Sequence, residues 1–294
     1  MGAVIRAEWY RSTRSWRFWV TAGLVVAVFV YTLLESANPW VGPSAENRFI
    51  PSYWNVYSAV VMMLFGGIEG FWPLFLPLFS VLPAGDSLAV DRRRGVDGVI
   101  MARVGWGRYL WGKWVGTTLA SVAAVTMALA VTWVGVVSVY PTTLPRLLGW
   151  QAPTAVGVKV PPGVFAEQYM PFGLHFFWAH PALYVVGVVL LALWATAALS
   201  GLSVAASVWI RHPLLTLAVP LVICWAINFL FNTSNLTPYV YGGQYLIVIT
   251  QPRPSPFSWA GVALYWAVPV ALVALILGIL TVRGREWPAW TVGR

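Results

Sequence analysis

Charged residues are scarce in this sequence. Asp, Glu, Lys and Arg together make up 9% of its 294 residues, whereas soluble globular proteins carry about 25%. Hydrophobic residues make up 59% of the chain. This composition excludes an ordinary soluble domain and indicates a membrane protein.

Residues that bind metals or act as nucleophiles are also rare. The single cysteine, Cys224, lies inside an apolar run, so there is no disulfide framework and no cysteine metal site. The sequence contains no H-E-x-x-H pattern and no pair of acidic residues within an apolar run. We therefore expect no catalytic residue, no metal site and no cofactor in this chain.

The charge that is present is mostly positive. A net charge of +9 could indicate a nucleic-acid partner. The basic residues, however, lie at the ends of apolar runs and form no stripe on a soluble domain, which is the distribution of residues that orient a membrane protein. We expect a lipid membrane, and no nucleic acid, as the environment of these charges.

Six apolar runs have about the 20 residues that a helix needs to cross a bilayer. They lie at about 18–35, 58–82, 110–139, 180–208, 213–232 and 258–282. The sequence thus predicts an all-α polytopic membrane protein with one transmembrane domain over residues 1–294. In residues 1–17, tryptophans gather near one helical face and arginines occupy much of the rest, which predicts an amphipathic helix in the membrane interface.

The basic residues also predict the orientation. With the N-terminus inside, fourteen of the eighteen Lys and Arg residues fall in cytoplasmic segments and four in outer segments. Arg and Lys in short loops favour the cytoplasmic side, so both termini are predicted to be cytoplasmic and the protein to be multi-pass in the cell membrane. The outer loops are then 36–57, 140–179 and 233–257.

Glu69 is the one carboxylate near the middle of a predicted span. Placing it there costs about 2.5–3.5 kcal/mol, so it should face protein or water. Gly66 and Gly70 have the spacing that permits close helix approach. Two interpretations stay open: a polar point on a transport path, and a packing residue at a helix contact.

The stretch Pro83–Lys113 concentrates charge between two apolar runs. It holds three of the nine acidic and six of the eighteen basic residues. Such a stretch cannot lie in hydrocarbon, so we expect residues 83–109, the charged segment, to be helical and to lie on the cytoplasmic surface. Lys113, beside Trp114, is expected to extend to the interface at the mouth of the third span. The segment is predicted to contact a cytoplasmic partner; a solvated linker without a partner is the other interpretation.

Three motifs in this stretch resemble the permease subunits of type-2 ABC exporters. They are Leu82-Pro83-Ala84-Gly85-Asp86-Ser87, Asp91-Arg92-Arg93-Arg94-Gly95 and Arg108-Tyr109-Leu110-Trp111-Gly112-Lys113. The six spans, the N-terminal helix and the cytoplasmic ends agree with that family's layout. Asp91 departs from it, because Glu is more frequent at that position.

The resemblance implies a coupling contact between the charged segment and a separate ATP-binding subunit, which would bind ATP and magnesium. It also implies a dimer of permeases, with a second copy or a homologue, and export between them. The residues assigned to the coupling contact are Asp86, Asp91, Arg92, Arg93, Arg94, Gly95 and Asp97.

The predicted function is therefore the membrane-spanning permease subunit of an ATP-driven exporter, with no enzymatic activity of its own. One alternative is a membrane scaffold that recruits a non-ATPase partner through the same segment. A second alternative, an ion-coupled carrier, depends on Glu69 alone.

Overall fold

The computed structural model describes residues 1–36, 57, 60, 71–139, 180–232 and 259–283, and within them it contains helices and no strand. The predicted all-α class is confirmed for this part of the chain. The helices are α1 (Gly2–Thr13), α2 (Trp16–Ser36), α4 (Phe71–Val81), α5 (Ser87–Arg93), α6 (Val96–Val104), α7 (Trp106–Val139), α10 (Pro181–Ala206), α11 (Pro213–Asn232) and α13 (Trp259–Arg283).

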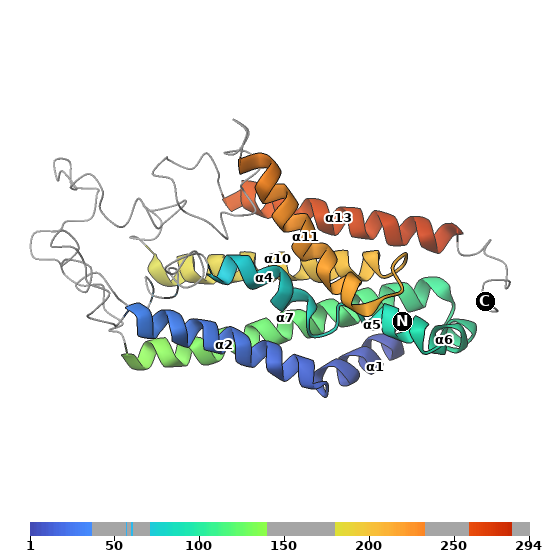
Figure 1. Ribbon diagram of the computed structural model, residues 1–294, viewed down its shortest axis with the longest axis horizontal. Helices are drawn as coiled ribbons and strands as arrows, with labels where there is room; N and C mark the ends of the chain where they lie inside the picture. Colours follow the sequence, from blue (N-terminus) through green and yellow to red (C-terminus); the bar gives the residue numbers. More distant parts are fainter. Residues whose placement is uncertain (37–56, 58–59, 61–70, 140–179, 233–258, 284–294) are drawn as a thin grey trace, which may run out of the picture.

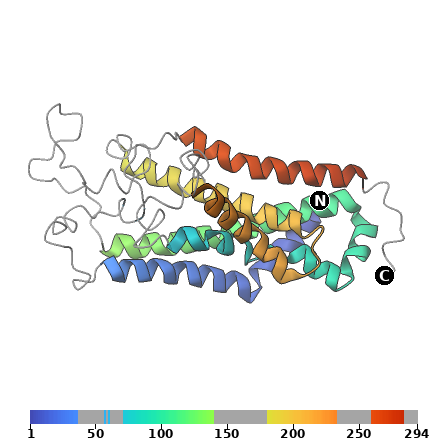
Figure 2. The same cartoon turned by 45° about the horizontal axis from the view of Figure 1, so that its top comes forward.

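The longest helix, α7, lies at the centre of a helical bundle. It contacts α1, α2, α10 and α13, and α10 also contacts α4 and α11 (Figure 1). The long helices run roughly along the long axis of the molecule, and the short helices α1, α5 and α6 gather at one end of it, as both ribbon views show (Figure 2). We call this the charged end.

Two helices of the described part are long and apolar enough to cross a membrane. They cover Trp106–Ser138 of α7 and Pro181–Ala206, and the shorter apolar stretches Trp16–Tyr31, Pro213–Ala226 and Ala267–Val282 accompany them. Large apolar side chains face outward, including Leu190 (60% exposed) and Val134 (69% exposed). Exposed apolar surface of this extent is typical of contact with lipid or with another protein.

The predicted spans correspond to helices where the structure describes them. The fifth predicted span has the same bounds as α11, the fourth covers α10, and the third lies within α7. Of the second, 58–82, the structure describes the helical part α4. The predicted outer loops 140–179 and 233–257 lie outside the described residues.

The interior consists of two apolar clusters. One joins α2, α4, α7 and α10 around Phe29, Leu76 and Tyr184. The other lies at the charged end and joins α5, α7 and α13 through Leu88, Leu110 and Leu277. The second cluster fixes the charged segment to the long helices before any charged contact is considered.

The predicted amphipathic helix over 1–17 is two helices in the structure. α1 ends at Thr13, and α2 begins at Trp16, where the Ser15 hydroxyl accepts a hydrogen bond from the Arg17 amide (3.3 Å). A serine in this position caps a helix N-terminus, which explains the break. We call Arg14 and Ser15, between the two helices, the elbow.

The charged segment is helical, as predicted, but it forms two short helices. α5 ends before Gly95, which has φ = +68°, and α6 ends before Gly105, which has φ = +82°. Residues other than glycine rarely adopt these backbone angles, so the two glycines allow both turns. The segment therefore folds back across the charged end.

Candidate functional site

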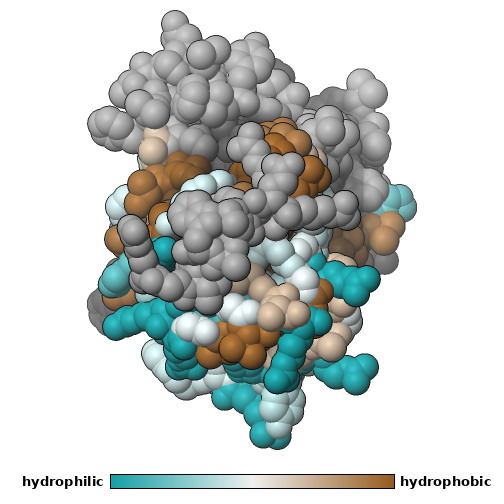
Figure 3. Space-filling view, turned by 90° about the vertical axis from the view of Figure 1, so that its right-hand side faces the viewer, coloured by the Kyte–Doolittle hydropathy of each residue, from teal (hydrophilic) through white to brown (hydrophobic). Residues whose placement is uncertain are grey.

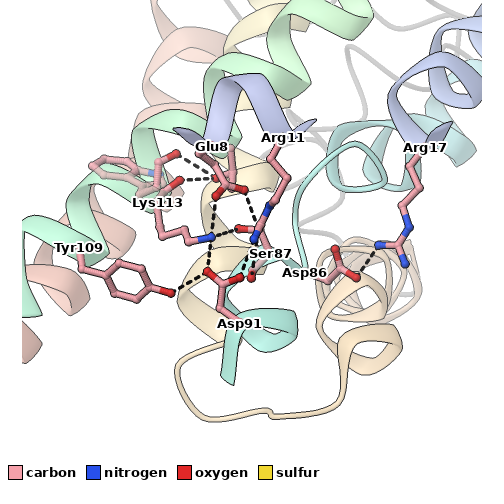
Figure 4. A network of polar contacts seen from close by, with 10 residues as sticks. Glu8, Arg11, Arg17, Asp86, Ser87, Asp91, Tyr109 and Lys113 are labelled. Atoms are coloured by element: carbon pink, nitrogen blue, oxygen red, sulfur yellow. Dashed lines mark hydrogen bonds and ion pairs between the residues drawn. The ribbon is translucent and has the colours of Figure 1, made fainter. Parts of the chain in front are cut away.

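A group of charged side chains is buried where α1, α5 and α7 meet (Figure 4). The Lys113 ammonium on α7 lies 2.5 Å from a carboxylate oxygen of Glu8 on α1 and 2.6 Å from one of Asp91 on α5. All three residues are nearly inaccessible, with 2%, 3% and 4% of their surface exposed, respectively. A single lysine thus joins three helices.

Arg11, whose side chain is 40% exposed, completes this group at its outer edge. Its guanidinium lies 2.5 Å from Asp91 and 2.9 Å from Glu8, and it also donates a hydrogen bond to the carbonyl oxygen of Ser87 (3.3 Å). We call Glu8, Arg11, Asp91 and Lys113 the buried ion network. Its two acids and two bases sum to zero charge, which is the condition under which buried ions are tolerated.

The Tyr109 hydroxyl donates a further hydrogen bond to Asp91 (2.9 Å), so both carboxylate oxygens of Asp91 have partners. Burial opposes ionisation of Asp91, but Lys113 and Arg11 outweigh it and hold the pKa of this carboxyl below its ordinary value. Burial likewise opposes the charge of Arg11, and Glu8 and Asp91 outweigh it, so the pKa of Arg11 lies above its ordinary value. Both shifts favour the charged forms of Asp91 and Arg11 at neutral pH.

Two glycines of α7 let α1 approach closely enough to form the network. A Cβ atom at Gly112 would lie 2.7 Å from Cβ of Val4, and one at Gly116 would lie 2.7 Å from Cβ of Glu8. The Gly-x-x-x-Gly spacing places both on one face of α7, and small residues at this spacing permit close helix contact. The face of α1 that packs against these glycines consists of the buried residues Val4, Glu8 and Ser12.

A second ion pair fixes the start of the charged segment to α2. The Arg17 guanidinium lies 2.5 Å from a carboxylate oxygen of Asp86, which is 3% exposed. Beside it, a Cβ at Gly85 would lie 2.7 Å from the carbonyl oxygen of Val81 and 2.8 Å from the Ser203 hydroxyl. The small-residue turn after α4 is thus held between α2 and α10.

Arg92 links the charged segment to the C-terminal end of α10. Its guanidinium donates to the carbonyl oxygen of Ser207 (3.1 Å) and to that of Val208, and lies 3.9 Å from Asp97. A cation at the last carbonyls of a helix satisfies acceptors that the helix leaves free and interacts favourably with its dipole. α5 is therefore tied to α1, α7 and α10.

The structure divides the predicted coupling residues into two groups. Asp86, Asp91 and Arg92 point into the protein and bind other helices, and Asp97 lies beside Arg92. Arg93, Arg94 and Gly95 are exposed. A direct contact of Asp91 with another protein does not fit this arrangement, because the side chain is enclosed by three partners within the chain.

The expectation for Lys113 was wrong. It does not extend to the interface, because two carboxylates from other helices reach it inside the protein. Sequence reasoning also missed the other members of the site, Glu8, Arg11 and Tyr109. One signal was present: Glu8 is the only acidic residue before Glu35, in a region with four arginines.

The predictions for Glu69, Gly66 and Gly70 stay predictions, because these residues lie outside the described part of the chain. Among the described residues, no group of three or more His, Cys, Asp or Glu side chains could hold a metal ion. Comparisons with known protein families and with curated proteins find no match. The resemblance to ABC permeases therefore rests on the sequence motifs alone.

Proposed function

We propose that this chain is the membrane-spanning permease subunit of an ATP-driven ABC exporter. It crosses the cell membrane six times with both termini in the cytoplasm and pairs with a second permease copy or homologue. A separate ATP-binding subunit binds ATP and magnesium, performs hydrolysis, and docks on the charged segment. The chain itself contributes the substrate path and the coupling element.

The way in which the charged segment is held carries the proposal. α5 has ionic or hydrogen-bonded ties to α1, α7 and α10, through Arg11, Lys113 and Arg92, respectively. The tie between Lys113 and Asp91 is a buried ion pair, and breaking such a pair costs about 3–5 kcal/mol. A displacement of α5 by a docked protein would therefore move the ends of these helices rather than break the ties, and this is the property a coupling element needs.

The outer side of the segment has the chemistry of a docking surface. Arg93, Arg94 and Arg103 are exposed on it, together with Val96 (42% exposed) and Val99 (57% exposed). We call these five residues the arginine tip. Figure 3 looks onto this end of the molecule, where hydrophilic residues project around an apolar patch.

Charge complementarity specifies what the tip would bind. The carboxylates whose side chains the structure describes, Glu8, Asp86, Asp91 and Asp97, all have a basic partner within the chain. The charge left on the tip is therefore positive. A groove with acidic residues around an apolar centre would fit it and fix its register.

The test is purification of the tagged chain from its native host in mild detergent, with mass spectrometry of the proteins that accompany it. The variant Arg93→Glu/Arg94→Glu reverses two exposed charges without touching the buried ion network, and Arg6→Glu/Arg14→Glu, which reverses two exposed charges away from the arginine tip, is the matched control. We expect a near-stoichiometric P-loop ATPase with the wild-type chain and the control, and its loss with the double variant. The absence of an ATPase from every sample would refute the proposal.

A membrane scaffold would use the same surface, because the arginine tip suits any acidic partner. The same purification separates the two functions. A stoichiometric partner without a nucleotide-binding motif, lost in Arg93→Glu/Arg94→Glu, would support the scaffold.

A further inference from the structure

The residues on both sides of the elbow form a second exposed surface, separate from the arginine tip. Four aromatic residues are exposed within eleven positions: Trp9 (40%), Tyr10 (55%), Trp16 (67%) and Trp19 (59%). We call them the aromatic face. It lies where the chain passes from α1 into α2, whose apolar stretch begins at Trp16 (Figure 1).

The two faces of α1 differ in a way that a simple amphipathic helix does not. Val4, Glu8 and Ser12, at intervals of four, form the buried face against α7. By the helical repeat Arg6 and Tyr10 fall on the opposite face and Trp9 falls on the side of the helix, and all three are exposed. The carboxylate of the buried face, Glu8, is therefore satisfied by protein, and the aromatic rings are exposed.

The arginines of this region are divided in the same manner. Arg11 and Arg17 point inward and pair with Asp91 and Asp86, respectively. Arg6 and Arg14 are exposed, and neither forms an ion pair with a carboxylate of the described residues. The outward surface thus has two positive charges that no carboxylate in the described part of the chain neutralises.

Internal contacts hold this surface in shape. The Arg14 guanidinium lies 4.2 Å from the centroid of the Tyr10 ring. The Trp19 indole N–H donates a hydrogen bond across the elbow to the carbonyl oxygen of Thr13 (3.1 Å). These contacts hold Tyr10, Arg14 and Trp19 in place before any ligand binds, which lowers the entropic cost of binding.

We propose that the aromatic face, with Arg6 and Arg14, binds the headgroups of anionic phospholipids. Tryptophan and tyrosine favour the headgroup level of a bilayer, where their rings are apolar and their N–H or O–H groups meet water. Arginines at that level attract anionic lipid phosphates. The mixture of rings and arginines distinguishes this surface from the arginine tip, which has aliphatic side chains and suits an acidic protein. The proposal needs the membrane location but no ATPase, so its outcome is independent of the docking test above.

Thermal unfolding of the full chain, purified in a neutral detergent, tests the proposal. Dioctanoyl-phosphatidylglycerol, dioctanoyl-phosphatidylcholine, inorganic phosphate and poly-glutamate are titrated separately, and an apparent Kd is taken from each shift in midpoint. Arg6→Gln/Arg14→Gln removes the two free charges, and Arg93→Gln/Arg94→Gln removes the same charge from the arginine tip. Each arginine near an anionic headgroup contributes about fivefold in affinity, so we expect Arg6→Gln/Arg14→Gln, the elbow variant, to bind phosphatidylglycerol at least about tenfold more weakly.

The control variant, Arg93→Gln/Arg94→Gln, is expected to keep the wild-type affinity for phosphatidylglycerol. Equal stabilisation by phosphatidylcholine would overturn the proposal, because it would show no preference for an anionic headgroup. Equal stabilisation by inorganic phosphate would indicate a free-anion site instead. Stabilisation by poly-glutamate that the elbow variant loses would indicate an acidic protein partner and would also overturn it.

Discussion

Replacement of Lys113 by methionine probes the contact that joins α1, α5 and α7. Methionine has nearly the volume of lysine but no charge, so Glu8 and Asp91 would have to share Arg11, whose side chain is 40% exposed. Removing one partner of a buried ion pair costs about 3–5 kcal/mol. Since Arg11 remains, we expect the lower end of this range, about 3 kcal/mol of unfolding free energy.

A second change makes the test specific to charge. Glu8→Gln in the Lys113→Met background restores zero net charge to the network and leaves the Arg11 to Asp91 pair intact. The double variant should therefore lose about 2 kcal/mol less than the sum of the two single variants, within the range of 0.5–3 kcal/mol known for contacting residues.

The measurement is the free energy of unfolding of the four proteins in mild detergent with added denaturant. Arg93→Met serves as the control, since an exposed substitution should change stability by less than about 0.5 kcal/mol. Losses that simply add in the double variant would refute the reasoning, because Glu8 and Lys113 would then act independently of one another.

Three further predictions follow from other contacts. Gly116→Ala should cost about 1–3 kcal/mol by pushing α1 away from α7 and should raise protease cleavage of α1, whereas Gly135→Ala on the same helix has open space around its Cβ and should cost little. Arg92→Gln should lower the unfolding midpoint by weakening its hydrogen bonds to the end of α10, and Arg93→Gln, one residue on and exposed, should leave it unchanged. Because the pKa of Asp91 is depressed in the folded protein, its ionisation stabilises the fold above its ordinary pKa of 3.8, and this stabilisation declines as the pH falls below it. The difference in free energy of unfolding between wild type and Asp91→Asn, measured by acid unfolding, should therefore decrease as the pH falls below 3.8.

The helices could be predicted because each is specified by local sequence. The bounds of α11 follow from an apolar run that starts at Pro213, a residue favoured at the first position of a helix. α10 likewise begins at a proline, Pro181. The break at the elbow was missed, because a serine cap lies inside a pattern of Trp and Arg that continues through it.

The buried ion network could not be predicted in this way, because its members are far apart in the chain. Glu8 and Lys113 are 105 positions apart, and Arg11 and Asp91 are 80 apart. Nothing in the residues next to Lys113 supplies a negative charge, so the local pattern favours an interfacial side chain. The spacing of Gly112 and Gly116 indicates a helix contact, but it does not identify α1 as the helix in contact.

The distance between Glu8 and Lys113 along the chain has a consequence for biosynthesis. A ribosome adds about 5–20 residues per second, so α1 emerges several seconds before the lysine of α7 that binds the Glu8 carboxylate. During that interval Arg11 is the one basic residue of the network that can pair with Glu8, and the pair stays hydrated because its other partners have not been made. The N-terminal helix would then take its final place against α7 only after α7 has been made, as a late step in the folding of the charged end.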